Sequence, residues 1–117
     1  MQDTEKLLAS NPTDLGDLPF QQIELAENKV IRVFDSDVSE DELKWHWDEE
    51  DRLIKVLNSP DWLLQIDNAF PVALKENQLH YIREGVWHRL IKGTTNLIVE
   101  ITKIKTYGRT SSNQSSE

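Results

Sequence analysis

The chain has 117 residues, of which 38% are hydrophobic and 29% are charged, and its formal net charge is −8. This charge disfavours a nucleic-acid partner or an anionic membrane surface, because both are bound mainly through lysine and arginine. The chain has no cysteine, which excludes disulfides and thiolate metal sites, and no apolar run approaches the length of a membrane-spanning helix. We therefore expect a soluble, cytoplasmic protein.

Composition along the chain predicts one domain with two tails. Residues 1–18 carry no sustained hydrophobic period, which favours a short disordered or partly helical arm. Residues 107–117 are polar and rich in serine, which favours a disordered C-terminal tail. Residues 19–106 contain no repeat and no linker, so they are expected to form a single domain.

In the first half of this domain, the sequence pattern of one segment fits both a helix and a strand. Ile23–Phe34 is compatible with two strands turned at Glu27-Asn28. In the segment 39–57, Ser39 opens a capping box, and apolar residues then recur near helical spacing, which favours a helix. Read as a strand, the same segment has one face that is polar at its start and apolar at Ile54 and Val56. The pattern alone leaves both interpretations open.

Strand signals dominate the second half of the domain. Short alternating apolar runs are separated by polar turns, a pattern typical of an all-β sandwich or barrel. A glycine at the Glu84-Gly85 turn permits a positive φ, and Asn77 is the next best residue for such a conformation. The predicted strands are Trp62–Asp67, a short run at Val72 and Leu74, Leu79–Ile82, Trp87–Ile91 and Asn96–Ile104.

Two segments with polar side chains, one containing His46 and one containing His88, lie at the starts of predicted strands. His46 lies two positions before Asp48, and His88 follows the Gly85 turn. Side chains at the mouths of strands converge on an internal pocket when a sheet closes into a barrel. No serine stands beside a base in a way that would support a serine hydrolase.

The segments around His46 and His88 resemble the two signature motifs of the cupin superfamily, whose members are small jelly-roll barrels. The first family motif is G-x5-H-x-H-x3-4-E-x6-G, and the second is G-x5-P-x-G-x2-H-x3-N. In the first motif His46 fits, while Asp48, Arg52 and Ser59 replace the second His, the Glu and the closing Gly. In the second motif Gly85 and His88 fit, while Asn77, Arg83 and Lys92 replace the opening Gly, the Pro and the Asn.

The same segments are also similar to short single-domain cupins carried by tailed phages of marine cyanobacteria. The stretches WHxDxEDR and YHRxIKG recur in those proteins. Here the corresponding stretches are Trp45–Arg52 and Trp87–Gly93. The resemblance implies an all-β, single-domain, cupin-like jelly-roll barrel.

The resemblance also implies a metal site at His46, Asp48 and His88. Two histidines and one carboxylate suit non-haem Fe(II), and Mn, Ni or Zn are the other candidates. Arg52 argues against a metal, because a permanent cation beside the ion would repel it. Arg52 would instead pair with Asp48, or a register shift of one residue would bring Asp51 into the pocket in its place.

Three interpretations of function remain open, and the sequence does not decide whether the protein is an enzyme. The first is a metal-binding cupin with a small polar ligand in a barrel-mouth pocket formed by Arg52, Trp47 and Trp87. The second is a metal-free small-molecule or sugar-binding module, which an Asp48–Arg52 bridge would favour. The third is a structural or interaction dimer of phage origin. The resemblance also implies a homodimer paired through an edge strand, with Ile23–Phe34 at the interface, and such pairing would cover an exposed sheet edge.

Overall fold

A computed structural model describes residues 18–105, and almost all of its regular secondary structure is β-strand. The predicted arm up to residue 17 and the predicted tail 107–117 lie outside the described residues. Within residues 18–105 there is no α-helix, and no helix there is long and apolar enough to cross a membrane. The elements are β1 (Gln21–Ala26), β2 (Lys29–Phe34), the 3-10 helix η2 (Glu40–Glu42), β3 (Asp51–Val56), β4 (Leu63–Ile66), β5 (Val72–Ala73), β6 (Leu79–Ile82), β7 (His88–Ile91) and β8 (Leu97–Ile104). The predicted all-β class is confirmed.

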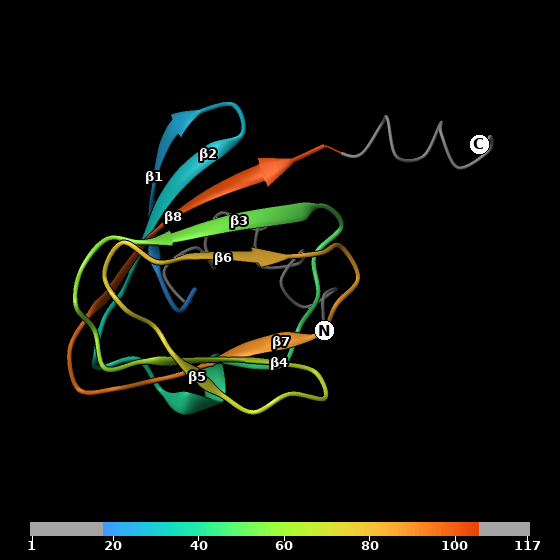
Figure 1. Ribbon diagram of the computed structural model, residues 1–117. Helices are drawn as coiled ribbons and strands as arrows, with labels where there is room; N and C mark the ends of the chain where they lie inside the picture. Colours follow the sequence, from blue (N-terminus) through green and yellow to red (C-terminus); the bar gives the residue numbers. More distant parts are fainter. Residues whose placement is uncertain (1–17, 106–117) are drawn as a thin grey trace.

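The strands form two antiparallel sheets that face each other (Figure 1). The larger sheet has the order β1-β2-β8-β3-β6, and the smaller sheet has the order β5-β4-β7. β8 lies at the centre of the larger sheet and pairs with β2 on one side and β3 on the other. β1 forms one edge of this sheet and β6 the other, and all six residues of β1 are exposed. The oligomeric state stays a prediction.

Alternation along the strands places the core between the two sheets. On β8, Leu97, Val99 and Ile101 are buried, whereas the residues between them are only partly covered. Successive side chains of a strand point to opposite faces, so one apolar set fills the interior. Trp62 is fully buried, packs 5.8 Å from Phe34 between ring centroids, and donates its indole N–H to the carbonyl of Thr95. The contiguous buried cluster is Val30, Phe34, Val56, Trp62, Leu64, Leu74, Ile82, Leu97, Val99 and Ile101.

Neither interpretation holds for the whole of residues 39–57, because only Asp51–Val56 forms a strand and no α-helix is present in the segment. The capping signal is real but supports only one 3-10 turn, in which the Ser39 hydroxyl accepts from the Asp41 amide at 3.1 Å. The chain then runs without helix to β3, which pairs with both β6 and β8. Hydrogen bonds to two neighbouring strands outweigh the weak local helix preference of this segment.

The predicted tight turns are confirmed by their backbone angles. Gly85 has φ of +77° and Asn77 has φ of +70°. Both angles lie in the left-handed region, which glycine and asparagine adopt at the least cost. An additional Cβ at Gly85 would meet nothing within 4 Å, so conformation alone requires glycine there.

Gly93 is required for a different reason, because the loop after β7 lies directly against Asp61. A Cβ at Gly93 would come within 2.4 Å of the Asp61 backbone oxygen. The Asp61 carboxylate accepts hydrogen bonds from the amides of Thr94 and Thr95, at 2.8 and 3.2 Å, and from the Thr94 hydroxyl at 2.6 Å. The Thr94 hydroxyl and amide hold the pKa of Asp61 well below its usual range. Asp61 thereby fixes the turn that leads into β8.

We predict that Gly93→Ala is more destabilising than Gly85→Ala. The left-handed conformation at Gly85 costs alanine about 1 kcal/mol, whereas alanine at Gly93 must displace the backbone of Asp61. Urea unfolding of the two variants measures the difference. Gly85→Asn serves as the matched control and should lose less stability than Gly85→Ala. Equal losses for the two alanine variants would contradict the close contact at Gly93.

Candidate metal centre

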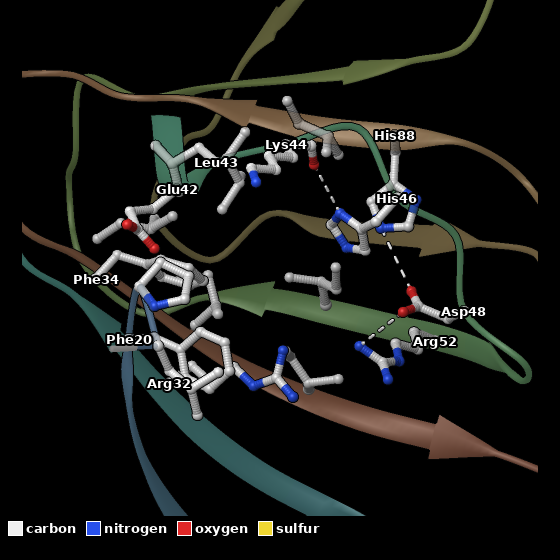
Figure 2. Close-up of a pocket in the computed structure, with 18 of the residues that line it drawn as sticks. Phe20, Arg32, Phe34, Glu42, Leu43, Lys44, His46, Asp48, Arg52 and His88 are labelled. Atoms are coloured by element: carbon white, nitrogen blue, oxygen red, sulfur yellow. Dashed lines mark hydrogen bonds and ion pairs between the residues drawn. The ribbon is translucent and has the colours of Figure 1, made fainter. Parts of the chain in front are cut away.

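A pair of backbone hydrogen bonds brings His46 and His88 together. The His46 amide donates to the His88 carbonyl at 3.0 Å, and the His88 amide donates to the His46 carbonyl at 2.8 Å. The imidazole centroids lie 4.3 Å apart. The segment that leads into β3 is therefore joined to the first residue of β7, so the larger and the smaller sheet each supply part of the site (Figure 2).

Each imidazole is oriented by a backbone carbonyl two residues upstream. His46 Nδ1 lies 3.0 Å from the Lys44 carbonyl oxygen, and His88 Nδ1 lies 2.8 Å from the Val86 carbonyl oxygen. A carbonyl only accepts hydrogen bonds, so Nδ1 carries the proton in both rings. In the neutral ring Nε2 then keeps its lone pair, which is the arrangement that metal-binding histidines use.

Asp48 completes the group from a buried position. Only 3% of Asp48 is exposed, and its Oδ2 lies 3.3 Å from His88 Nε2 yet forms no well-formed hydrogen bond. Two acceptor atoms that face each other repel unless a proton or a metal ion lies between them. One ligand atom from each of His46, Asp48 and His88 lies within 4.8 Å of the others. Ligands bonded to one ion at about 2.1 Å in a tetrahedron lie about 3.4 Å apart, so the triad fits an ion with a small inward movement.

Arg52 contacts Asp48 but is shared with a second carboxylate. Its Nη1 lies 3.3 Å from Asp48 Oδ1, while its Nε donates to Glu50 Oε2 at 2.6 Å. The bridge to Asp48 is therefore single rather than bidentate, and it uses the oxygen that faces away from His88. The Glu50 carboxylate offsets much of the guanidinium charge beside the triad.

The surroundings keep Asp48 ionised. Burial alone would raise the pKa of Asp48, but the contact with His88 and the charges of Arg52 and His46 outweigh burial and lower the pKa. The carboxylate is thus an anion at neutral pH, as a ligand for a cation must be.

The register of β3 places Arg52, and not Asp51, on the inner face. Arg52 pairs with Lys103 of β8 and Ile82 of β6, and its side chain lines the cavity together with Ile54. Asp51 is 1% exposed and points the other way, where it accepts hydrogen bonds from the Tyr81 hydroxyl and, at 2.8 Å, from the Glu84 amide. Asp51 therefore anchors the β6–β7 turn.

A cavity of about 200 Å³ opens beside the triad. Its wall includes Trp45, whereas Trp47 and Trp87, the tryptophans expected there from the sequence, lie elsewhere. Neither tryptophan lies in a strand: Trp47 stands between His46 and Asp48, and Trp87 directly precedes the first residue of β7. Trp87 is 39% exposed.

The sequence analysis missed Arg32, which also lines the cavity. Arg32 lies on β2 between Val30 and Phe34, which are both buried on the inner face. An arginine that shares the face of buried apolar residues in an alternating strand is the signal that was available.

We predict that Asp48→Asn destabilises the metal-free protein by about 2–4 kcal/mol at neutral pH, because it leaves the partly buried Arg52 guanidinium without the anion that it contacts inside the protein. The lowered pKa of Asp48 means that its contribution is present above the unfolded pKa near 3.8 and is lost as pH falls through the folded value. The difference between variant and wild type should therefore shrink towards pH 3. Thermal unfolding of both proteins at several pH values, after metal has been removed with a chelator, measures this difference in stability.

Glu50→Gln is the matched control, because Glu50 is more exposed and its loss should cost less than about 1 kcal/mol. If Asp48→Asn proved no more destabilising than Glu50→Gln at pH 7, the electrostatic account of the triad would be wrong.

Comparison with known proteins places this geometry on a known fold. Neither the models of protein families nor the curated proteins match the sequence. Solved structures do match. An RmlC-like cupin with a double-stranded β-helix fold from Methanocaldococcus jannaschii has a TM-score of 0.58 and 14% identity over 79% of this chain and 84% of its own. An RmlC-like cupin from Shewanella frigidimarina has a TM-score of 0.56 and 12% identity over 77% and 78%.

HppE in its Fe(II) form has a TM-score of 0.56 and 15% identity, and the match covers 73% of this chain but 48% of HppE. At identities this low the likeness establishes the fold alone. The predicted resemblance is confirmed at that level: residues 18–105 have the double-stranded β-helix fold of the RmlC-like cupins.

Proposed function

We propose that this protein is a small cupin-like metal-binding protein that holds a divalent ion through His46, Asp48 and His88 and a small ligand in the adjoining cavity. The observation that carries the proposal is the orientation of the two imidazoles. Both are held through Nδ1 by backbone carbonyls, and a buried carboxylate oxygen without a hydrogen bond faces one of the remaining ring nitrogens. This arrangement presents three ligand atoms to one point.

The donor set favours particular metals. Two imidazoles and one carboxylate suit non-haem Fe(II), and Mn, Ni and Zn accept the same ligands. HppE, which shares the fold, has been solved with Fe(II) and with Co(II), and this supports a first-row divalent ion. Such an ion, when bound, supplies a Lewis acid with coordination positions open to a ligand from the cavity.

The side chains around the triad have supporting tasks in this proposal. The Lys44 and Val86 carbonyls fix the tautomer and ring orientation of the histidines. Arg52 holds one oxygen of Asp48 and leaves the other directed at His88. Two unit charges 4 Å apart interact by about 4 kcal/mol at an effective dielectric of about 20. The Glu50 carboxylate bound to Arg52 therefore reduces the repulsion between the guanidinium and a metal ion at the triad.

A metal-free ligand-binding module is the second candidate, and the Asp48–Arg52 contact favours it. In that case a proton on His88 Nε2 takes the place of the ion and satisfies Asp48 Oδ2. The triad is then a buried ion-pair network that shapes the cavity wall.

Elemental analysis by plasma mass spectrometry separates the two candidates. We expect the untagged protein, incubated with Fe(II) under nitrogen or with Zn(II) and then desalted, to carry close to one ion per chain. His88→Ala should lose it, because one of three ligands is removed. His80→Ala is the matched control: His80 contacts Gln78 and is not part of the triad, so it should keep the ion. Circular dichroism checks that both variants fold.

If the wild type carried no metal ion after either incubation, the metal proposal would be wrong and the metal-free candidate would remain.

Arg52→Gln gives an independent test. If a metal ion binds at the triad, removal of the neighbouring cation should leave the affinity for Zn(II) equal to or greater than that of the wild type. A competition titration with a chromophoric chelator measures this affinity. A loss of more than about tenfold, or about 1.4 kcal/mol, would instead show that the triad depends on Arg52 as part of an ion-pair network.

A further inference from the structure

The cavity beside the triad lies inside the core, between the two sheets. Its volume is about 200 Å³. Leu43 and Ile54 contribute half-buried aliphatic side chains to its wall. Both sheets also contribute buried apolar side chains, among them Phe34, Leu64, Leu97, Val99 and Ile101. A ligand in this cavity therefore meets hydrocarbon over most of its surface.

The two guanidinium groups in the wall are already bound by protein acceptors. Arg52 Nε donates to Glu50 Oε2 at 2.6 Å, and Arg52 Nη1 lies 3.3 Å from Asp48 Oδ1. Arg32 Nε donates to Gln22 Oε1 at 2.8 Å. A ligand with several polar groups would have to replace such contacts or bury its own groups without partners, and both changes cost free energy. The wall therefore favours a ligand with few polar groups.

The triad forms the polar end of the cavity. His46, Asp48 and His88 all line it, and one ligand atom of each lies within 4.8 Å of the others. Glu42 and Lys44 also line the cavity, but both residues are exposed, so water can solvate their charges. Figure 2 shows Glu42 on the opposite side of the view from Asp48. A ligand would thus place one polar group at the triad and lay its hydrocarbon along the wall.

The volume of the cavity limits the size of its ligand. A void in a core lowers stability in proportion to its volume, because the side chains around it lack contacts there. An apolar molecule that fills the void supplies these contacts. An apolar cavity of about 150 Å³ holds benzene, so by proportion a cavity of about 200 Å³ holds about eight non-hydrogen atoms.

We infer that the cavity binds a ligand of at most about eight non-hydrogen atoms, with one polar group at the triad and a hydrocarbon body against the wall. The inference names the ligand class of the proposed site and therefore rests on the proposed function. It assigns Leu43 and Ile54 as specificity-determining residues that select a hydrocarbon chain over an ether of the same size.

Alkyl hydroxamates test the inference on the protein loaded with Zn(II), because the hydroxamate group binds the ion while the alkyl chain contacts the wall. Isothermal titration calorimetry measures the affinities of acetohydroxamate, pentanohydroxamate and octanohydroxamate. Methoxypropanohydroxamate is the matched ligand, because it has the length of pentanohydroxamate but carries an ether oxygen in place of the methylene next to the terminal methyl group.

Leu43→Gln and Ile54→Gln place an amide in the wall and leave the triad unchanged. Leu43 lies outside the strands, so its variant tests the wall even if Ile54→Gln does not fold. Leu53→Gln is the matched control, because Leu53 precedes Ile54 on β3 and points to the other face of the sheet. Circular dichroism checks the fold of each variant.

We expect the affinity to rise about fourfold for each methylene from acetohydroxamate to pentanohydroxamate, and to rise no further in octanohydroxamate, whose chain exceeds the cavity. Pentanohydroxamate should bind at least about fivefold more tightly than its ether analogue, because the ether oxygen is buried without a donor. That ratio should fall at least about threefold in Leu43→Gln and Ile54→Gln, and change less than about 1.5-fold in Leu53→Gln.

Three results would overturn the inference. The first is equal affinity along the series, and the second is a rise that continues to octanohydroxamate. The third is a ratio of pentanohydroxamate to ether affinity that both wall variants leave unchanged.

Cyclohexane and dioxane separate this inference from the proposed function, because neither ring needs a metal. The rings have nearly the same size and differ in their ether oxygens, and nuclear magnetic resonance titration measures their binding to the chelator-treated protein. If no sample binds Zn(II) but cyclohexane binds more tightly than dioxane, with a smaller difference in Leu43→Gln, the metal proposal fails and the ligand class stands. If Zn(II) binds stoichiometrically but neither pair of ligands shows a preference, the ligand class fails and the metal proposal stands.

Discussion

The two backbone hydrogen bonds between His46 and His88 are the constraint on which the site depends. They join the segment before β3, in the larger sheet, to the first residue of β7, in the smaller sheet. Because backbone groups make this connection, the side chains of both histidines remain available. The same local backbone orients the rings, since each Nδ1 reaches a carbonyl two residues upstream. Position and tautomer are thus fixed together, and neither requires another side chain.

Charge balance around Asp48 is the second constraint. A carboxylate that is 3% exposed would be costly without a cation nearby, and the Arg52 guanidinium lies 3.3 Å from Asp48 Oδ1. Because its Nε donates to Glu50, the Arg52 guanidinium does not form a bidentate pair with Asp48. This sharing allows one side chain to belong to a structural network and to a candidate metal site at once.

Much of the fold was predictable because strand alternation and turn residues are local signals. The runs that became β4, β6, β7 and β8 are short, alternate in polarity and are bounded by polar turns. Gly85 and Asn77 were identified at their turns from their conformational freedom alone. The segment 39–57 was not predictable, because Ser39 and the acidic residues after it encode a real helical turn, and only pairing of β3 with β6 and β8 shows where that turn ends.

The candidate site was predictable in part. The resemblance to the cupin motifs placed His46, Asp48 and His88 in one group, and the structure brings one ligand atom of each within 4.8 Å of the others. The choice between Asp51 and Arg52 depended on register, which is set by hydrogen bonds to strands distant in sequence. Trp45 in the cavity wall was not predictable, because the segment before β3 meets the cavity only in three dimensions, whereas Arg32 alternates with Val30 and Phe34 in the sequence.

The central place of β8 has a consequence for how this chain acquires its structure. β8 is the last described strand in sequence, yet it lies between β2 and β3 and supplies both with hydrogen bonds. The larger sheet therefore cannot assemble before β8 is available, and its pairings span long stretches of chain. Such non-local topology slows folding, since loop-closure entropy must be overcome before the contacts form. During synthesis β2 and β3 would leave the ribosome without their shared neighbour, so the nascent chain depends on completion of β8 to bury its core.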